Sequence, residues 1–316
     1  MLYNYIGLIL CFNHNKEVFF VGTEDCFDSK LFTMTTITIA SVTKDGKKYS
    51  SQGSAFYYNE QSPAEPGKTG PQWYRLDKHW LVTNRHVVLP KIDNVECVPD
   101  EFVFCLREND NGVIKWKPIT LSKDELLANL KLHSQNNVDV ALVDITSHIQ
   151  NIISDIAAKN GKNIMLPTAL SNLNLPENQP MQIEVASDII VASYPKGFYD
   201  SENKFPIVKS GIVASAWGCY FNGLPIFQID AQLFPGSSGG LVISKPTNTA
   251  MIDGTLKVSQ TKQFVLLGVY SGEYTWDREI VVDGKKCTIN SSYGLGNVWY
   301  SHLIPEIITN GVSYTI

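Results

Sequence analysis

The chain has 316 residues, of which 44% are hydrophobic and 18% are charged. This composition supplies a large core and excludes a disordered chain, and the length suits one or two packed β units. The net charge of −5, without a block of lysines and arginines, argues against nucleic acid and against a membrane surface as partners.

Residues 5–12 (YIGLILCF) are apolar and follow the start methionine closely. A secretory signal would carry a basic residue before this run and a small-residue cleavage site after it, but no lysine or arginine precedes Lys16. We therefore expect a first buried strand here rather than a signal peptide. Residues 1–30 form, in this interpretation, an N-terminal segment that packs on the rest.

Strand patterns dominate the chain that follows. Residues 32–42 and 53–58 are rich in β-branched and aromatic residues, and the turn residues 44–47 between them predict a hairpin. Further short apolar runs occur at residues 80–82, 102–106, 138–145, 189–192, 226–229, 241–243 and 264–270. Many short strands separated by turn residues are typical of an all-β sandwich or barrel.

Two segments interrupt this series of short strands and suggest boundaries between structural units. Residues 60–72 hold three prolines and predict a long surface loop. Residues 149–158 carry isoleucines at helical spacing and predict a helix. We place this helix in a connector, residues 148–180, between a first β unit at 31–147 and a second at 181–316.

A short terminal helix is also compatible with residues 298–309, where Pro305 would either interrupt it or lie in its first turn.

Six cysteines are dispersed along the chain: Cys11, Cys26, Cys97, Cys105, Cys219 and Cys287. They form no C-x-x-C pair and no zinc-ligand spacing with a histidine, so we expect no metal site. Their dispersal in a large chain favours reduced cysteines in the core, although the even number leaves disulfides open.

Ser238 lies in the glycine-rich turn GSSGG, just after an apolar run. Most glycine-rich turns have no catalytic role. A serine nucleophile also needs a base within hydrogen-bond reach and a third group that orients the base. His86 follows the apolar run at 80–82. Asp139 lies at the start of another apolar run, where a buried carboxylate without a hydrogen-bond donor would cost free energy. Together these residues predict a nucleophile, a base and an orienting acid.

Asp144 is the competing carboxylate, and we reject it because it lies five residues inside the expected strand rather than at its head. The remaining histidines lack a comparable context, and we expect them on the surface or in structural roles: His14, His79, His133, His148 and His302.

Three motifs resemble those of the trypsin/chymotrypsin family, most closely its HtrA-like intracellular and bacterial branch. They read TNRHV around His86, DVAL from Asp139 and PGSSGG around Ser238, in the order and at the intervals of the family. Flanking similarities (GSAF, SGIV and LGV) extend the resemblance to about residues 31–305.

The resemblance implies two packed six-stranded antiparallel β-barrels with the active site between them. It implies a serine endopeptidase that needs no cofactor, acts on a protein or peptide substrate and forms an oxyanion hole from the backbone N–H groups of Gly236 and Ser238. A catalytically inactive member that binds a partner, or an esterase with the same triad, remains an alternative.

The resemblance also implies a pocket for the residue before the scissile bond, lined by Gln232, Leu233, Ser271, Gly272 and Glu273. The neutral amide of Gln232 stands where a carboxylate would select lysine or arginine. We therefore expect a preference for uncharged or apolar side chains, unless Glu273 points inward.

Departures from the family pattern concern regulation. Ser237 stands where secreted members carry an aspartate that receives a new N-terminal ammonium, so we expect no activation by zymogen cleavage. Val87 and Phe234 replace customary cysteines, which favours a cytoplasmic location but leaves secreted and periplasmic ones open. We expect no PDZ domain after Gly240. Control would then come from residues 1–30, from the loop at residues 60–72 or from a regulatory protein partner.

Overall fold

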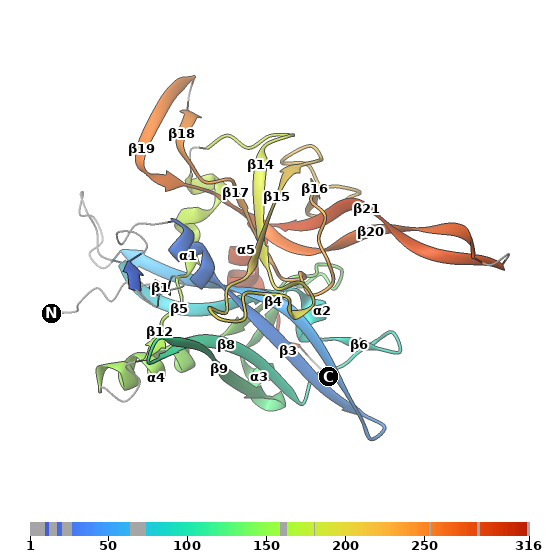
Figure 1. Ribbon diagram of the computed structural model, residues 1–316, viewed down its shortest axis with the longest axis horizontal. Coiled ribbons are helices and arrows are strands. Elements are labelled where there is room, and N and C mark those ends of the chain that lie inside the picture. Colours follow the sequence, from blue (N-terminus) through green and yellow to red (C-terminus); the bar gives the residue numbers. More distant parts are fainter. Residues whose placement is uncertain are drawn as a thin grey trace.

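The computed structural model describes residues 10–12, 18–20, 27–63, 74–158, 163–179, 181–252, 254–282 and 285–314. Most of these residues lie in strands, which form two units packed against each other (Figure 1). The expectation of an all-β fold is confirmed.

The first unit is, within the described residues, a nine-stranded sheet around β3 (Thr35–Lys44), β4 (Lys47–Pro63) and β5 (Tyr74–Thr83). Asp45 and Gly46 have φ angles of 52° and 73° and form the two-residue turn that residues 44–47 predict. The other strands are β8 (Glu101–Asp110), β9 (Val113–Ser122), β10 (Leu130–Leu132), β11 (Ala141–Asp144), β12 (Ile164–Met165) and β13 (Leu170–Ser171).

The second unit is a closed antiparallel barrel of six described strands in the order β14-β15-β16-β21-β20-β17. This barrel confirms one of the two expected barrels, and the nine-stranded sheet is consistent with the other. The strands are β14 (Asp188–Ser193), β15 (Ile207–Val213), β16 (Ile226–Asp230), β17 (Leu241–Ser244), β20 (Leu266–Val282) and β21 (Lys285–Tyr300).

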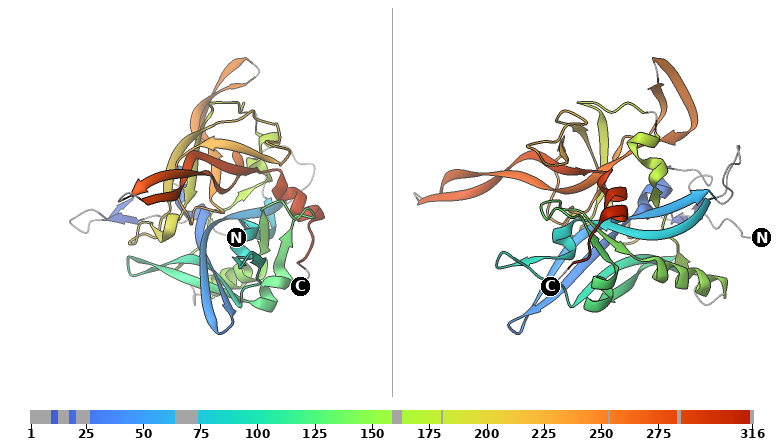
Figure 2. Two further views of the ribbon diagram at one scale, coloured as in Figure 1. Left: turned by 90° about the vertical axis from the view of Figure 1, so that its right-hand side faces the viewer. Right: turned by 180° about the vertical axis from the view of Figure 1, so that it is seen from behind.

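Two hairpins project from the barrel (Figure 2). The outer parts of β20 and β21 form the longer one, and β18 (Thr247–Ile252) with β19 (Thr255–Gln263) forms the other. Neither hairpin is predicted by the short apolar runs, because both arms are largely exposed and carry few core residues.

The side chains of β4 and β5 point alternately to two faces of the sheet, and this alternation explains how the two units are joined. Side chains of a strand point to opposite faces in turn. Tyr57 and Leu81 face the core of the first unit, whereas Phe56, Trp80 and Val82 face a second core shared with the barrel. Residues from the barrel and from the last helix complete this shared core: Leu241, Ile243, Trp299, Leu303, Ile304 and Ile307. Burial on both faces makes these strands read as continuous apolar runs.

The helices are α1 (Phe27–Met34), α2 (Arg85–Val88), α3 (Lys123–Asn129), α4 (Thr146–Ala157) and α5 (Leu303–Asn310). Helix α4 confirms the helix expected at 149–158, and α5 confirms a terminal helix with Pro305 in its first turn. In the parts of the chain that the structure describes, no helix is long and apolar enough to cross a membrane.

Some expected boundaries are wrong. Residues 32–34 end α1 rather than begin a strand, and residues 60–63 extend β4 rather than begin a loop. The latter residues pair with β5 despite their polar composition, because the hairpin ladder continues past the core. Residues 64–72 of the expected loop and residues 5–9 of the expected first strand lie outside the described residues, while residues 10–12 form β1 (Leu10–Phe12), which pairs with β2 (Val18–Phe20).

Among the four cysteines whose side chains the structure describes, the expectation of a core position holds for Cys105 only. Cys97, Cys105, Cys219 and Cys287 are thiols rather than disulfides, and Cys219 and Cys287 are exposed. The side chains of Cys11 and Cys26 lie outside the described part of the structure.

Candidate active site

His86 lies on α2, a single turn that follows β5 at the junction of the two units. Asn84, the residue before this turn, is fully buried, and its Nδ2 donates a hydrogen bond of 2.7 Å to the carbonyl of Asp139. On the other side of the turn, the guanidinium of Arg85 pairs with Glu96 at 2.8 Å. These contacts hold the backbone around His86 while its side chain remains 42% exposed.

The Asp139 carboxylate is held from three directions. Its Oδ1 accepts a hydrogen bond of 2.9 Å from the backbone N–H of His86. Its Oδ2 lies 2.7 Å from His86 Nδ1 and also accepts a hydrogen bond of 2.7 Å from the hydroxyl of Ser271, which comes from the second unit. A carboxylate in this position fixes the ring of His86 and holds the proton on Nδ1.

Asp144, the competing carboxylate, is engaged elsewhere. Its Oδ1 accepts hydrogen bonds from the backbone N–H and the hydroxyl of Thr146, and its Oδ2 pairs with Lys78 at 3.0 Å. Burial raises the pKa of Asp144, but the hydrogen bonds from Thr146 and Lys78 outweigh it and leave the pKa below its usual range. The structure therefore brings Asp139, and not Asp144, to His86.

Ser238 lies in the turn between β16 and β17, and this turn is attached to the first unit through Ser54. The backbone N–H of Ser54 donates to the carbonyl of Ser238 at 2.8 Å. The hydroxyl of Ser54 donates to the carbonyl of Gly236 at 2.8 Å and accepts from the backbone N–H of Tyr194 at 2.9 Å. One residue of the first unit thus binds the carbonyls of both Gly236 and Ser238 in this turn.

Gly239 shows how closely the two units approach. Its φ is 82°, and a Cβ added there would lie 2.0 Å from the carbonyl oxygen of Ser54. Its backbone N–H donates to the carbonyl of Tyr270 at 2.8 Å. Glycine is required at this position by both the backbone conformation and the space.

The hydroxyl of Ser238 donates a hydrogen bond of 2.8 Å to the carbonyl of Ser271. Among the hydrogen bonds of the described residues, none joins this hydroxyl to His86. Ser271 therefore contacts both Asp139 and Ser238. The sequence placed Ser271 in a specificity pocket, and its contact with Asp139 could not be read from the motif spacing.

Gly236 has a φ of 92°, and a Cβ there would lie 2.5 Å from the backbone nitrogen of Lys196 and 2.9 Å from the carbonyl oxygen of Tyr194. The backbone N–H of Lys196 donates to the carbonyl of Pro235 at 2.7 Å. Because the peptide unit is planar and trans, the N–H of Gly236 points away from Lys196. Ser237 is fully buried, and its hydroxyl accepts a hydrogen bond of 3.1 Å from the hydroxyl of Ser193.

The residues expected to line the specificity pocket differ in exposure. Gln232 is exposed, Leu233 is 2% exposed, and Gly272 and Glu273 are half-buried. The structure brings two of them together, because the backbone N–H of Leu233 donates to Glu273 Oε1 at 2.9 Å. The Glu273 side chain thus points toward the segment that leads to Ser238.

The other histidines have separate partners. His133 contacts Glu306 at 3.0 Å, and His79 contacts Asn59 at 2.8 Å. Burial lowers the pKa of His79 and of His302 below 6.5. His148 packs edge-on against Phe104, and His14 lies outside the described residues.

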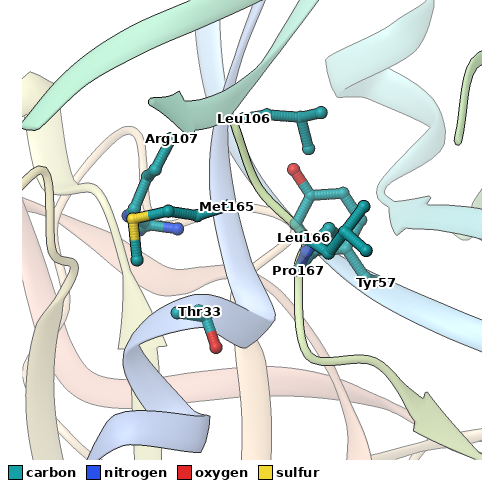
Figure 3. Close-up of a pocket in the computed structure, with 7 residues that line it drawn as sticks. All are labelled: Thr33, Tyr57, Leu106, Arg107, Met165, Leu166 and Pro167. Carbon is teal, nitrogen blue, oxygen red and sulfur yellow. The ribbon is translucent and has the colours of Figure 1, made fainter. Parts of the chain in front are cut away.

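Arg107 is a buried residue that the sequence analysis missed. It lines a small pocket beside Thr33, Tyr57, Leu106, Met165, Leu166 and Pro167 (Figure 3). Its guanidinium donates to the carbonyl of Lys204 at 2.7 Å, to the hydroxyl of Tyr194 at 2.6 Å and to the carbonyl of Thr35 at 3.3 Å. Arg107 therefore joins the first unit to the segment that contacts Gly236. An arginine in a strand pattern carries no sequence signal of such a role.

Comparisons with known proteins identify the family of the chain. The family described as "Trypsin-like peptidase domain" matches residues 53–249, which include His86, Asp139 and Ser238. A solved structure titled as the active form of the Rv3671c protease from M. tuberculosis is similar over 90% of this chain and 83% of that chain, with 14% identity and a TM-score of 0.40.

No curated protein matches the chain. The family match covers more than half of the residues, and the expected resemblance is confirmed at the level of the family. The chain belongs to the trypsin-like peptidases and is a serine protease, a hydrolase that acts on peptide bonds.

Proposed function

We propose that Ser238 attacks the carbonyl of the scissile peptide, that His86 takes and later returns the proton, and that Asp139 orients the imidazole. The observation that carries this proposal is the double attachment of Asp139 to His86, through Nδ1 at 2.7 Å and through the backbone N–H at 2.9 Å. With the Nδ1 proton held by the carboxylate, Nε2 is free to act as the general base.

Charge on the substrate oxygen develops as the tetrahedral intermediate forms, and it needs preorganised donors. Two backbone N–H groups of the nucleophile turn, those of Gly236 and Ser238, have no acceptor among the described residues. The bond from Lys196 to the carbonyl of Pro235 sets the orientation of the Gly236 N–H. These two groups are our proposed oxyanion hole.

The hydroxyl of Ser238 must turn from Ser271 toward His86 before it can lose its proton. We propose that the hydroxyl turns by rotation about the Cα–Cβ bond of Ser238 while the backbone stays in place, since hydrogen bonds from Ser54 and to Tyr270 hold the carbonyl of Ser238 and the N–H of Gly239. Hydrogen bonds between catalytic groups are often formed only in the complex with substrate. The bond to Ser271 is therefore compatible with activity.

The test is labelling with a fluorophosphonate, which reacts with an activated serine, together with hydrolysis of an unfolded protein substrate. We expect the wild type to be labelled and active, and Ser238→Ala to lose both properties. His86→Ala should lose labelling although Ser238 is present. A wild type that takes no label while correctly folded would contradict the proposal and favour an inactive member that binds a partner.

A further inference from the structure

We propose that one face of the outer β20–β21 hairpin binds an extended, apolar segment of the protein substrate at a distance from the scissile bond. The outer hairpin comprises residues 275–281 of β20 and 286–293 of β21, and it projects from the barrel at the right of Figure 1. The inference rests on the proposed function, because it concerns the polypeptide that Ser238 cleaves.

The two faces of the outer hairpin differ in chemistry. Its strands pair in regular register, and side chains directly opposite each other lie on the same face. The apolar face carries Trp276, Ile280, Ile289 and Tyr293, with Arg278 between the first two. The other face is polar except for Val281, and Glu279 and Lys286 form an ion pair there at 3.6 Å.

The apolar face is exposed to water. Trp276, Ile289 and Tyr293 are 42%, 40% and 61% exposed. The rings of Trp276 and Tyr293 lie 6.2 Å apart between centroids, and none of the apolar residues of this face belongs to a hydrophobic core of the described chain. A two-stranded hairpin has little stability of its own, and large side chains left in water do not contribute to it. A contiguous apolar surface of this kind is typical of an interaction site.

The outer hairpin is continuous with the strand that contacts the nucleophile. The carbonyl of Ser271, in the inner part of β20, accepts the hydrogen bond from Ser238. The pairing shifts register between Glu273 and Thr275, but β20 continues through this point. Trp276 and Ile280 lie five and nine residues after Ser271 in the chain. These intervals correspond to about 17 Å and about 30 Å along a strand.

One edge of β20 is open along this path. The inner part of β20 pairs with β17 as far as Val269, and β21 pairs with the other edge. Among the strands that the structure describes, only β21 pairs with β20 beyond Tyr270. An open edge offers backbone N–H and C=O groups to an added extended chain. A substrate that leaves Ser238 in extended form can therefore follow β20 and reach the apolar face.

The size of the apolar face favours one extended segment over a second copy of this chain. Its exposed side chains offer roughly 300 Å² of surface. Each partner in a stable dimer buries about 800 Å². Two paired strands are together about 10 Å wide, which suits one extended chain. We therefore expect apolar substrate residues about five to nine positions from the scissile bond to strengthen binding.

The experiment measures kcat and KM for peptides that share one cleaved core, taken from a site that the enzyme cuts in an unfolded protein. The core is extended on one flank or the other by a serine-rich segment, with two leucines either beside the core or about five to nine residues from the scissile bond. Because β20 leads away from Ser238 in one direction, only one flank can follow it. On that flank, we expect the distant leucines to raise kcat/KM at least about tenfold over the all-serine peptide, through a lower KM.

Substitutions on the two hairpins assign this effect to the apolar face. Trp276→Ser together with Tyr293→Ser should bring the distant-leucine peptide to within about twofold of the all-serine peptide. Asp277→Ser changes the polar face of the same hairpin and should leave the tenfold difference in place. Leu256→Ser, at a residue of the β18–β19 hairpin that is 62% exposed, should also retain the difference.

Binding of the distant-leucine peptide to Ser238→Ala, followed by fluorescence anisotropy, tests the apolar face without turnover. We expect the double substitution of Trp276 and Tyr293 to weaken this binding at least about fivefold. Equal kcat/KM for the distant-leucine and all-serine peptides on both flanks would overturn the inference, as would an equal loss in Leu256→Ser.

Two further outcomes separate the alternatives. If the double substitution converts a dimer into a monomer in sedimentation and keeps the difference between the peptides, the apolar face belongs to a second copy and the inference is overturned. If the wild type takes no fluorophosphonate while peptide binding depends on Trp276 and Tyr293, the result supports the inference and contradicts the proposed function alone.

Discussion

The hydroxyl of Ser271 donates a hydrogen bond of 2.7 Å to Asp139 Oδ2, the same oxygen that faces Nδ1 of His86. Ser271 belongs to the barrel, whereas Asp139 and His86 belong to the first unit. The Asp139 carboxylate therefore has partners in both units, and all of its hydrogen bonds form only when the units are packed together.

Asp139→Asn should reduce kcat by about four orders of magnitude, because an amide in place of the carboxylate favours the wrong tautomer of His86. Steady-state hydrolysis of a peptide substrate measures this. Asp144→Asn is the matched control, since Asp144 binds Thr146 and Lys78 instead. Equal losses in the two variants would show that the Asn substitutions act through stability.

Ser271→Ala should lower kcat/KM about tenfold, as expected for the loss of one hydrogen bond to a charged group. The carbonyl of Ser271, which accepts from Ser238, is retained in this variant. Kinetics together with a thermal melt separate the two effects. Unchanged kcat/KM would mean that His86 and its backbone alone hold Asp139.

Gly236→Ala should reduce kcat at least about a hundredfold, because the added methyl group collides with the backbone of Lys196 and displaces a proposed oxyanion donor. Gly46→Ala is the control: its φ is also positive, but a Cβ there meets nothing within 4 Å. It should cost about 1 kcal/mol of stability at most without changing kcat. The idea fails if Gly236→Ala retains full activity.

Arg107→Met should lower the free energy of unfolding by about 3 kcal/mol, because it leaves the buried oxygens of Thr35 and Tyr194 without this donor. Urea denaturation followed by fluorescence measures the loss. Arg75→Met, at a position whose side chain is 74% exposed, should change stability by less than about 0.5 kcal/mol. A similar small effect at Arg107 would show that water replaces its hydrogen bonds.

Stability should decrease as the pH falls below about 6.5. Burial lowers the pKa of His79 and of His302, so the unfolded chain takes up protons at a higher pH than the folded one. The free energy of unfolding is therefore complete above the unfolded pKa and declines as the pH drops toward the lowered folded values. Urea midpoints at pH 7.5, 6.5 and 5.5 test this, and the double substitution of His79 and His302 by glutamine should flatten the decline. A decline of the same size in that variant would assign the effect to other groups.

Several features of the fold could be predicted from the sequence because their causes are local. The alternating and β-branched runs predict strands, the turn at Asp45 and Gly46 predicts a hairpin, and the isoleucine spacing predicts α4. The long hairpin of β20 and β21 could not be predicted, because its outer part is exposed and carries no pattern of burial.

The sequence by itself determined the family and predicted the three residues on which the proposed chemistry depends, because motifs that surround reactive groups are short and contiguous. Only the tertiary structure showed the contact of Asp139 with His86, the bond from Ser271 to the same carboxylate, and the bond from the Leu233 N–H to Glu273. These contacts join residues that are 53, 132 and 40 positions apart. Their geometry depends on how the two units pack against each other. The positions of these residues in the sequence do not predict that packing.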